Sequence, residues 1–162
     1  MILDELAAYA SFRVAEAKKK TAADEMERKA RSLPKGDFRF EHALCNTGVS
    51  FICEVKRASP SKGLIAEDFP YVEIAREYEQ AGADCVSVLT EPKWFLGSDE
   101  IFKEIRAAIT LPMIRKDFTV DAYQIYEAKC MGADAVLLIC ALLPTETIRE
   151  YLNICDDPGL TA

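Results

Sequence analysis

The chain has 162 residues, of which 50% are hydrophobic and 29% charged, enough apolar material for one packed domain or a piece of a larger one. Its net charge of −7 argues against nucleic-acid binding, and an anionic ligand would need a local cationic pocket within this acidic body. No apolar run reaches the ~18 residues of a membrane span, and the N-terminus lacks an apolar signal-peptide core. We therefore expect a cytoplasmic protein without a membrane partner.

Six cysteines and one histidine restrict the possible chemistry. The cysteines never form a C-x-x-C pair, and Cys53, Cys85 and Cys140 lie in or beside apolar runs, where cysteine acts as a small hydrophobic residue. We expect reduced structural thiols, as in a reducing compartment. Because His42 is the single histidine, the sequence predicts neither a zinc site nor a triad with a histidine base, and no metal centre.

The first part of the chain has the pattern of a helical extension. Apolar residues recur at helical spacing over residues 3–31, and a second helical piece is expected from about Ala22. The run Leu33-Pro34-Lys35-Gly36 is typical of a helix end. After a connecting stretch to Gly48, the pattern changes, so we predict a helical extension at 1–48 and a second unit at 49–162.

From residue 49 onward a strand, a loop and a helix repeat four times. The expected strands are residues 49–56, 85–90, 112–116 and 135–140, and the expected helices are residues 71–81, 101–108, 122–130 and 145–155. Gly82 and Gly132 are suited to end two helices, and Thr145 to cap the start of the last. Residues 81–89 also resemble residues 131–139, as expected for repeated βα units.

These elements predict half of a barrel. Strands this apolar favour a parallel sheet that helices cover. Four βα units in about 114 residues make half of an eight-stranded TIM-type barrel, which usually takes ~250 residues. The predicted fold class is α/β, a TIM-type βα barrel truncated to roughly four βα units behind the helical extension. By the same rhythm, residues 157–162 would be the turn into a fifth strand.

Charged residues stand at the carboxyl ends of the predicted strands, where βα barrels gather their active sites. The period of two places Glu54 and Lys56 on one face of the first strand, and Lys116 ends the third. Two interpretations stay open. Lys56 pairs with Glu54 and Lys116 with Asp117 as structural ion pairs, or one lysine is a general acid and the other an anion anchor. In the second case the two cations, facing each other, would lower one another's pKa.

Two loops at these strand ends are open to similar alternatives. The aromatic loop Trp94-Phe95-Leu96-Gly97-Ser98 either caps the barrel rim or covers an aromatic ring of a substrate, and the same holds for Phe118. After the first strand, Ser59 and Ser61 are most simply turn residues around Pro60. The same loop offers hydroxyls, backbone N–H groups and Lys62 to an anionic ligand.

Together these segments resemble the indole-3-glycerol-phosphate synthase family. The run EVKRASPSKG at residues 54–63 is similar to the signature of that family. Further similar segments are SVLTE (87–91), FLGS (95–98), LPMIRKDF (111–118) and GADAVLLI (132–139). The helical N-terminus resembles the extension that this family places before its barrel, so the resemblance covers essentially the whole chain.

The resemblance implies a reaction and a set of roles. The family converts 1-(2-carboxyphenylamino)-1-deoxyribulose 5-phosphate to indole-3-glycerol phosphate by ring closure, decarboxylation and dehydration, without a cofactor. Lys116 would protonate the substrate carbonyl oxygen, Lys56 would bind the anionic groups, and Glu54 would hold the lysines in register. Ser59 would lie near the substrate carboxylate. The residues expected to pack against the anthranilate ring are Phe95, Phe118 and Leu137.

The sequence also departs from the family pattern. The second catalytic glutamate, on the fifth strand, and the phosphate loops after strands seven and eight have no counterpart in the 162 residues. We therefore expect little or no activity from this chain alone. The alternative is a half-barrel assembly module that dimerises or pairs with a separate C-terminal half, because open strand edges readily pair. A phosphoribosylanthranilate isomerase is a further alternative, against which the 54–63 motif and the helical extension speak.

Overall fold

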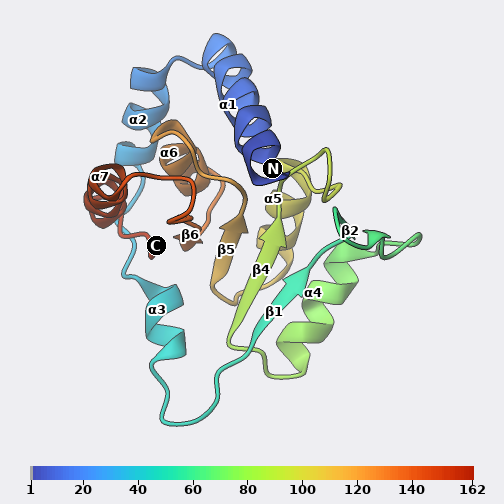
Figure 1. The fold of residues 1–162 in the computed structure, drawn as a ribbon. Coiled ribbons are helices and arrows are strands. Elements are labelled where there is room, and N and C mark those ends of the chain that lie inside the picture. Colours follow the sequence, from blue (N-terminus) through green and yellow to red (C-terminus); the bar gives the residue numbers. More distant parts are fainter. Residues whose placement is uncertain (1) are drawn as a thin grey trace.

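The computed structural model describes residues 2–162 (Figure 1). Three helices come first: α1 (Ile2–Lys20), α2 (Ala23–Ser32) and α3 (Arg39–Leu44). Four strands follow in the order β1 (Ile52–Val55), β4 (Cys85–Leu89), β5 (Met113–Lys116) and β6 (Ala135–Val136). They alternate with the helices α4 (Tyr71–Gln80), α5 (Asp99–Ala108), α6 (Tyr123–Cys130) and α7 (Thr145–Asp156). A short antiparallel pair, β2 (Ala58–Ser59) and β3 (Gly63–Leu64), projects after β1.

The four alternating strands form one parallel sheet in the order β1-β4-β5-β6. Their register places Glu54 opposite Ser87 and Leu89 opposite Lys116. A helix joins each strand to the next, as parallel neighbours require. The predicted parallel sheet of repeated βα units is therefore confirmed.

The two faces of the sheet differ. On the outer face, the buried side chains of Val86 and Val88 share one hydrophobic core with Phe102 and Ile105 of α5. Helices α6 and α7 extend the same core with Ile125, Tyr151 and other buried side chains. Because side chains alternate along a strand, the neighbouring residues face the opposite, inner side of the sheet, which carries the polar groups of the strand ends.

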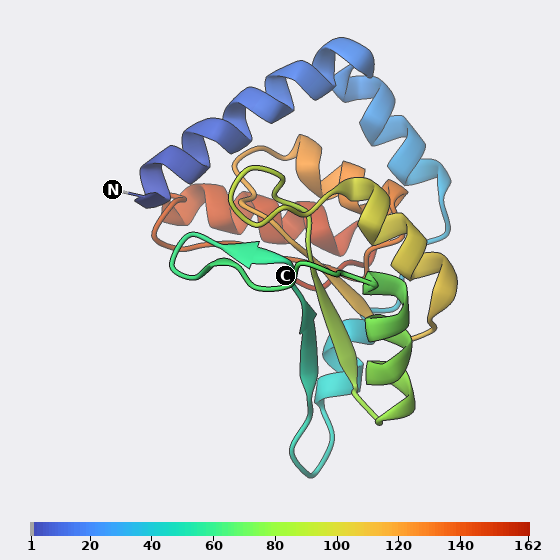
Figure 2. The ribbon, with the colours of Figure 1, turned by 90° about the vertical axis from the view of Figure 1, so that its right-hand side faces the viewer.

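The helical extension reaches both ends of the sheet. Figures 1 and 2 show α1 running across the carboxyl ends of the strands, while α3 lies beside their amino ends. There, Phe40 of α3 packs in a small buried cluster with Cys85 and Ala135, the first residues of β4 and β6. Between them, α2 packs along α6, with Glu27 accepting a hydrogen bond from Tyr126. The boundary at residue 48 stays a prediction.

Three local predictions need correction. The stretch expected to be a plain connection contains α3, whose six residues are too few for a periodic signal. The strand expected at 135–140 pairs with β5 only through Ala135 and Val136. Thr145 does not cap α7 but is its first residue, behind Pro144.

The last residues pack back on the rest of the chain. Gly36 donates its N–H to the carbonyl of Pro158 at 2.8 Å, and Thr161 pairs in parallel with Ala135. Gly159 has φ 71°, and a Cβ there would meet the carbonyl oxygen of Gly36 at 2.1 Å. A glycine is thus required where these two backbone segments cross.

Candidate active site at the carboxyl ends of the strands

The carboxylate of Glu54 lies between the ammonium groups of two lysines. Lys56 donates to its Oε1 at 2.7 Å and Lys116 to its Oε2 at 3.0 Å. The hydroxyl of Ser87, opposite Glu54 in the sheet, donates to Oε2 at 3.2 Å. The side chains of Glu54, Lys56 and Lys116 are 29%, 33% and 36% exposed, so a ligand can reach them. The structure thus brings together the three residues for which we predict catalytic roles, and those roles stay predictions.

The lysines determine the charge state of Glu54. Burial acts to raise the pKa of this carboxyl group, but the hydrogen bonds from Lys56 and Lys116 outweigh it and hold the pKa below its ordinary value. Glu54 is therefore ionised at neutral pH. Two cations that share one anion leave an excess positive charge at the site, which suits an anionic substrate.

An apolar cavity of about 210 Å³ opens beside these charges. The rings of Phe95 and Phe118 both line it and pack against each other, tilted by 44° with centroids 6.1 Å apart. Its lining consists of Glu54, Lys56, Leu89, Phe95, Lys116, Asp117, Phe118, Leu137 and Ile139. Of the seven residues predicted for the site, only Ser59 is missing from this list.

Ser59 lies in the β2–β3 turn instead. Its hydroxyl accepts the backbone N–H of Lys62 at 3.3 Å and is 3.5 Å from the hydroxyl of Ser61. This geometry agrees with the interpretation of both serines as turn residues. The turn is nevertheless tied to the cavity, because Ala58 donates its N–H to the carbonyl of Phe95 at 3.2 Å.

Different residues of the aromatic loop agree with the two interpretations, a cap on the barrel rim and a cover for a substrate ring. Phe95 lines the cavity, whereas Trp94 packs edge-on against Tyr9 of α1, with ring centroids 5.6 Å apart. Lys93 lies over the Trp94 ring, 4.3 Å from its centroid. Trp94 therefore connects the loop after β4 to α1 of the helical extension, while Phe95 belongs to the candidate site.

One of the two open interpretations paired Lys116 with Asp117, and this pairing is wrong, because adjacent residues at a strand end point to opposite faces. The pair of Lys56 with Glu54 in the same interpretation is present. Asp117 is 4% exposed and binds Arg13 of α1 through two hydrogen bonds, of 2.6 and 3.1 Å. It also accepts the hydroxyl proton of Thr90 at 2.6 Å and the N–H of Phe118 at 2.8 Å. Arg13 stands 104 residues away in sequence, so no local pattern could have predicted this pairing.

The carboxylates of Asp117 and Glu54 predict a loss of stability in acid. Burial raises the pKa of Asp117, but hydrogen bonding and charge from Arg13, with Arg115 and Thr90, hold it below its ordinary 3.8. A depressed folded-state pKa stabilises the fold above the unfolded-state pKa, and this contribution disappears as the pH falls through the folded value. We expect the urea concentration at the unfolding midpoint to decrease as the pH is lowered below about 4.5, and to decrease less steeply in Asp117→Asn. Equal acid dependence of the wild type and this variant would contradict the assignment.

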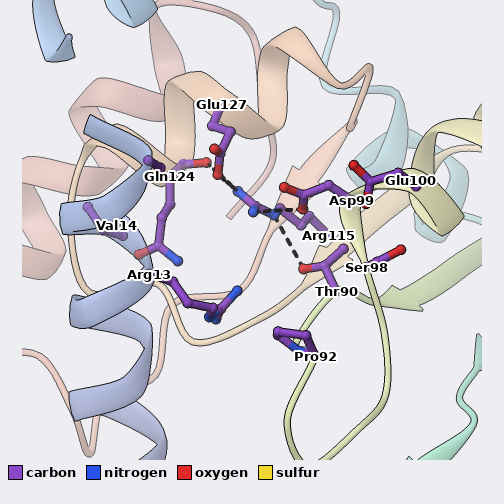
Figure 3. A pocket seen from close by; sticks show the side chains of 11 residues that line it. Arg13, Val14, Thr90, Pro92, Ser98, Asp99, Glu100, Arg115, Gln124 and Glu127 are labelled. Atoms are coloured by element: carbon purple, nitrogen blue, oxygen red, sulfur yellow. Dashed lines mark hydrogen bonds and ion pairs between the residues drawn. The ribbon is translucent and has the colours of Figure 1, made fainter. Parts of the chain in front are cut away.

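A second cavity, of about 220 Å³, lies between α1, α5 and α6 (Figure 3). Arg115 points into it from β5 and is 4% exposed. Its guanidinium binds Glu127 at 2.8 Å and Asp99 at 3.0 Å and also donates to the Gln124 carbonyl at 3.2 Å. Burial acts to lower the pKa of Arg115, and the two carboxylates reverse this and raise it. The charge is thus satisfied internally, and the arrangement fastens β5 to α5 and α6.

Parallel βα units with charged side chains and an apolar, ring-lined cavity at the carboxyl ends of their strands are typical of barrel-type α/β enzymes. The fold agrees with one solved structure of such units, a mandelate oxidase mutant with (S)-mandelic acid, at a TM-score of 0.51 and 14% identity over 82% of this chain and 49% of that one. The family model for indole-3-glycerol phosphate synthase matches residues 3–162. The chain therefore belongs to the indole-3-glycerol phosphate synthase family.

Curated relatives with the same family name support the assignment. Indole-3-glycerol phosphate synthase of Ruminiclostridium cellulolyticum is 52% identical over 99% of this chain and 62% of the relative. The protein of that name from Endomicrobium trichonymphae is 49% identical over 99% of this chain and 63% of the relative. The chain thus spans less than two thirds of the length of these relatives.

Proposed function

We propose that the protein to which this chain belongs is an indole-3-glycerol-phosphate synthase, a carboxy-lyase of tryptophan biosynthesis. Its substrate would be the phosphorylated anion 1-(2-carboxyphenylamino)-1-deoxyribulose 5-phosphate. The observation that carries the proposal is the Glu54 carboxylate shared by Lys56 and Lys116 at the mouth of the cavity that Phe95 and Phe118 line. An aromatic ring that bears a carboxylate requires this combination of an apolar slot and nearby cations.

Lys116 would act as the general acid. As the ring carbon attacks the substrate carbonyl carbon, a carbon–carbon bond forms and the carbonyl oxygen takes a proton from the Lys116 ammonium group. Loss of carbon dioxide and of water then restores the aromatic ring system. Glu54, at 3.0 Å from Nζ, keeps the ammonium group aimed into the cavity. The acid is effective only if it is held at this position.

The other site residues would bind the substrate. Lys56 would hold anionic groups of the substrate and assist later proton transfers, while Phe95, Phe118 and Leu137 would pack against the anthranilate ring. For Ser59 the support is weaker, because its hydroxyl lies in the adjoining turn. A substrate carboxylate that reaches this turn would find the hydroxyl and backbone N–H groups there.

The test of this function needs a full-length enzyme. We define the fusion synthase as residues 1–162 joined to the part of the Ruminiclostridium relative that lies outside the match. The fusion synthase, incubated with the carboxyphenylamino-deoxyribulose phosphate, should produce indole fluorescence. The Ruminiclostridium relative, assayed in parallel, is the positive control. A folded fusion synthase that gives no indole product beside an active relative would refute the proposal.

The 162-residue chain alone is expected to give little or no product. It contains the proposed acid, Lys116, but no fifth-strand glutamate, and the loss of one acid–base partner commonly costs about 10²–10⁴ in rate. The same fluorescence assay measures this directly. Turnover by the purified chain at the rate of the relative would contradict the prediction.

A half-barrel assembly module is the second candidate function, and the edge of the sheet favours it. Val49, Phe51 and Ile52, at the start of β1, are exposed apolar side chains, and β1 lies at the sheet edge. Such an edge can accept another strand, from a second copy or from a complementing half-barrel. Sedimentation velocity decides for the free chain: a species of twice 18.1 kDa supports self-assembly, and a stable 18.1 kDa monomer contradicts it.

A cytoplasmic location completes the proposal. The six cysteines are free thiols, as expected in a reducing compartment. Among the helices within residues 2–162, none has the length and apolar character that crossing a membrane requires.

A further inference from the structure

The loop from Glu91 to Gly97 turns back sharply on the end of β4. The N–H of Gly97 donates to the carbonyl of Glu91 at 2.9 Å, and a Cβ at Gly97 would lie 2.1 Å from the carbonyl oxygen of Leu89. Leu96 has φ 53°, in the left-handed region that a leucine rarely adopts. A loop held in so uncommon a conformation needs a specific interaction to fix it.

The buried carboxylate of Glu91 supplies that interaction. The residue is 1% exposed, and its Oε1 accepts the backbone N–H of Lys93 at 3.0 Å. Its Oε2 accepts the N–H groups of Trp94 at 2.7 Å and Phe95 at 3.0 Å. Three backbone N–H donors thus converge on the two oxygens of one buried carboxylate, and hydrogen bonds to a carboxylate are stronger than those between neutral groups.

The loop conformation in turn sets the position of Phe95. The Phe95 ring lines the strand-end cavity and packs against Phe118, and the Phe95 carbonyl accepts the N–H of Ala58 beside the serine turn. If the hydrogen bonds to Glu91 are lost, neither the Phe95 ring nor the hydrogen bond between Phe95 and Ala58 is held in place. Lys56, Lys116 and Glu54 lie on other strands and keep their mutual contacts.

We propose that Glu91 is a positioning residue, whose buried carboxylate fixes Phe95 as the wall of the ring slot and thereby sets the affinity for the aromatic part of the substrate. This inference rests on the proposed function for its substrate. Because a ring contact of this kind exists in both the ground state and the transition state, its loss raises KM and leaves kcat nearly unchanged.

The variant Glu91→Gln tests the proposal in two ways, with Glu100→Gln, at an exposed position of α5, as the matched control. In the 162-residue chain, amide exchange should accelerate about 10- to 100-fold at whichever of Lys93, Trp94 or Phe95 faces the new NH₂ group, because NH₂ cannot accept a hydrogen bond, whereas the remaining carbonyl oxygen still can. In the fusion synthase, KM should rise by about 10-fold with kcat within about threefold, since the ring contact is uniform binding. Glu100→Gln should change neither quantity.

The two measurements separate the possible failures. Unchanged exchange in Glu91→Gln overturns the proposal whatever the enzyme does, and so does faster exchange with unchanged KM. A fall in kcat at constant KM also overturns it. Amide exchange in β4 and β5 reports whether Glu91→Gln folds. If the amides of these strands are unprotected in Glu91→Gln, the variant Glu91→Asp, which keeps the carboxylate, is measured in its place. A wild-type fusion synthase without activity contradicts the proposed function instead, while amide exchange still decides whether Glu91 holds Phe95.

Discussion

Replacement of Lys116 by methionine in the fusion synthase is expected to lower kcat by about 10²–10⁴, because the proposed general acid acts only in the transition state. The unbranched methionine fills nearly the same volume but has no proton to give. KM should change little, since Lys56 still offers a cation to the substrate anion. Steady-state kinetics with indole fluorescence as the readout measures both parameters.

Two further variants make this result specific. Lys103→Met removes an exposed lysine on α5 and should leave both parameters unchanged. Lys56→Met should raise KM more than it lowers kcat, because Lys56 is proposed to bind the substrate in the ground state as well. A Lys116→Met enzyme that retains the wild-type kcat would show that another group donates the proton.

The largest expected loss of stability follows from Arg115→Ala. The change leaves Asp99 and Glu127 without their shared cation at a site where Arg115 is 4% exposed. Removing one side of a buried ion pair costs about 3–5 kcal/mol, and we expect about 3 kcal/mol here, because Asp99 and Glu127 are 33% and 19% exposed and therefore partly solvated. For a chain of this size the loss corresponds to a fall in Tm of roughly 10 °C.

Chemical denaturation of the 162-residue chain measures this loss directly. Arg76→Ala on α4 is the control, since Arg76 is exposed and surface arginines contribute little to stability. A free energy of unfolding within about 1 kcal/mol of the wild type in Arg115→Ala would mean that the network does not fasten β5 to α5 and α6.

The sequence predicts the sheet and the position of the site because both follow from local patterns. Apolar runs interrupted by Gly82 and Gly132 specify strands that alternate with helices, and parallel strands place their carboxyl ends together. The clustering of Glu54, Lys56 and Lys116 follows from this geometry. Strand ends are less certain: β6 is shorter than its apolar run, because pairing depends on the neighbouring strand and not on composition.

The contacts that support the site could not be predicted, because they join distant segments or involve the backbone. In the sequence, Arg13 is one of several charged residues of the first predicted helix. Its contact with Asp117 exists only because α1 packs over the strand ends. The sequence shows Glu91 only as an acidic residue after a strand, and the folded loop is needed to place its carboxylate among three N–H groups. The pair of Lys116 with Asp117, which one of the two interpretations contained, is wrong for a related reason, since the partner of each lies on another element.

A crystal structure of the fusion synthase with indole-3-glycerol phosphate tests the central claim most directly. The account predicts an indole ring packed against Phe95 and Phe118, with the ammonium groups of Lys56 and Lys116 directed at the ligand. An indole ring bound elsewhere, for example in the cavity that Arg13 and Arg115 line beneath α1, would contradict it.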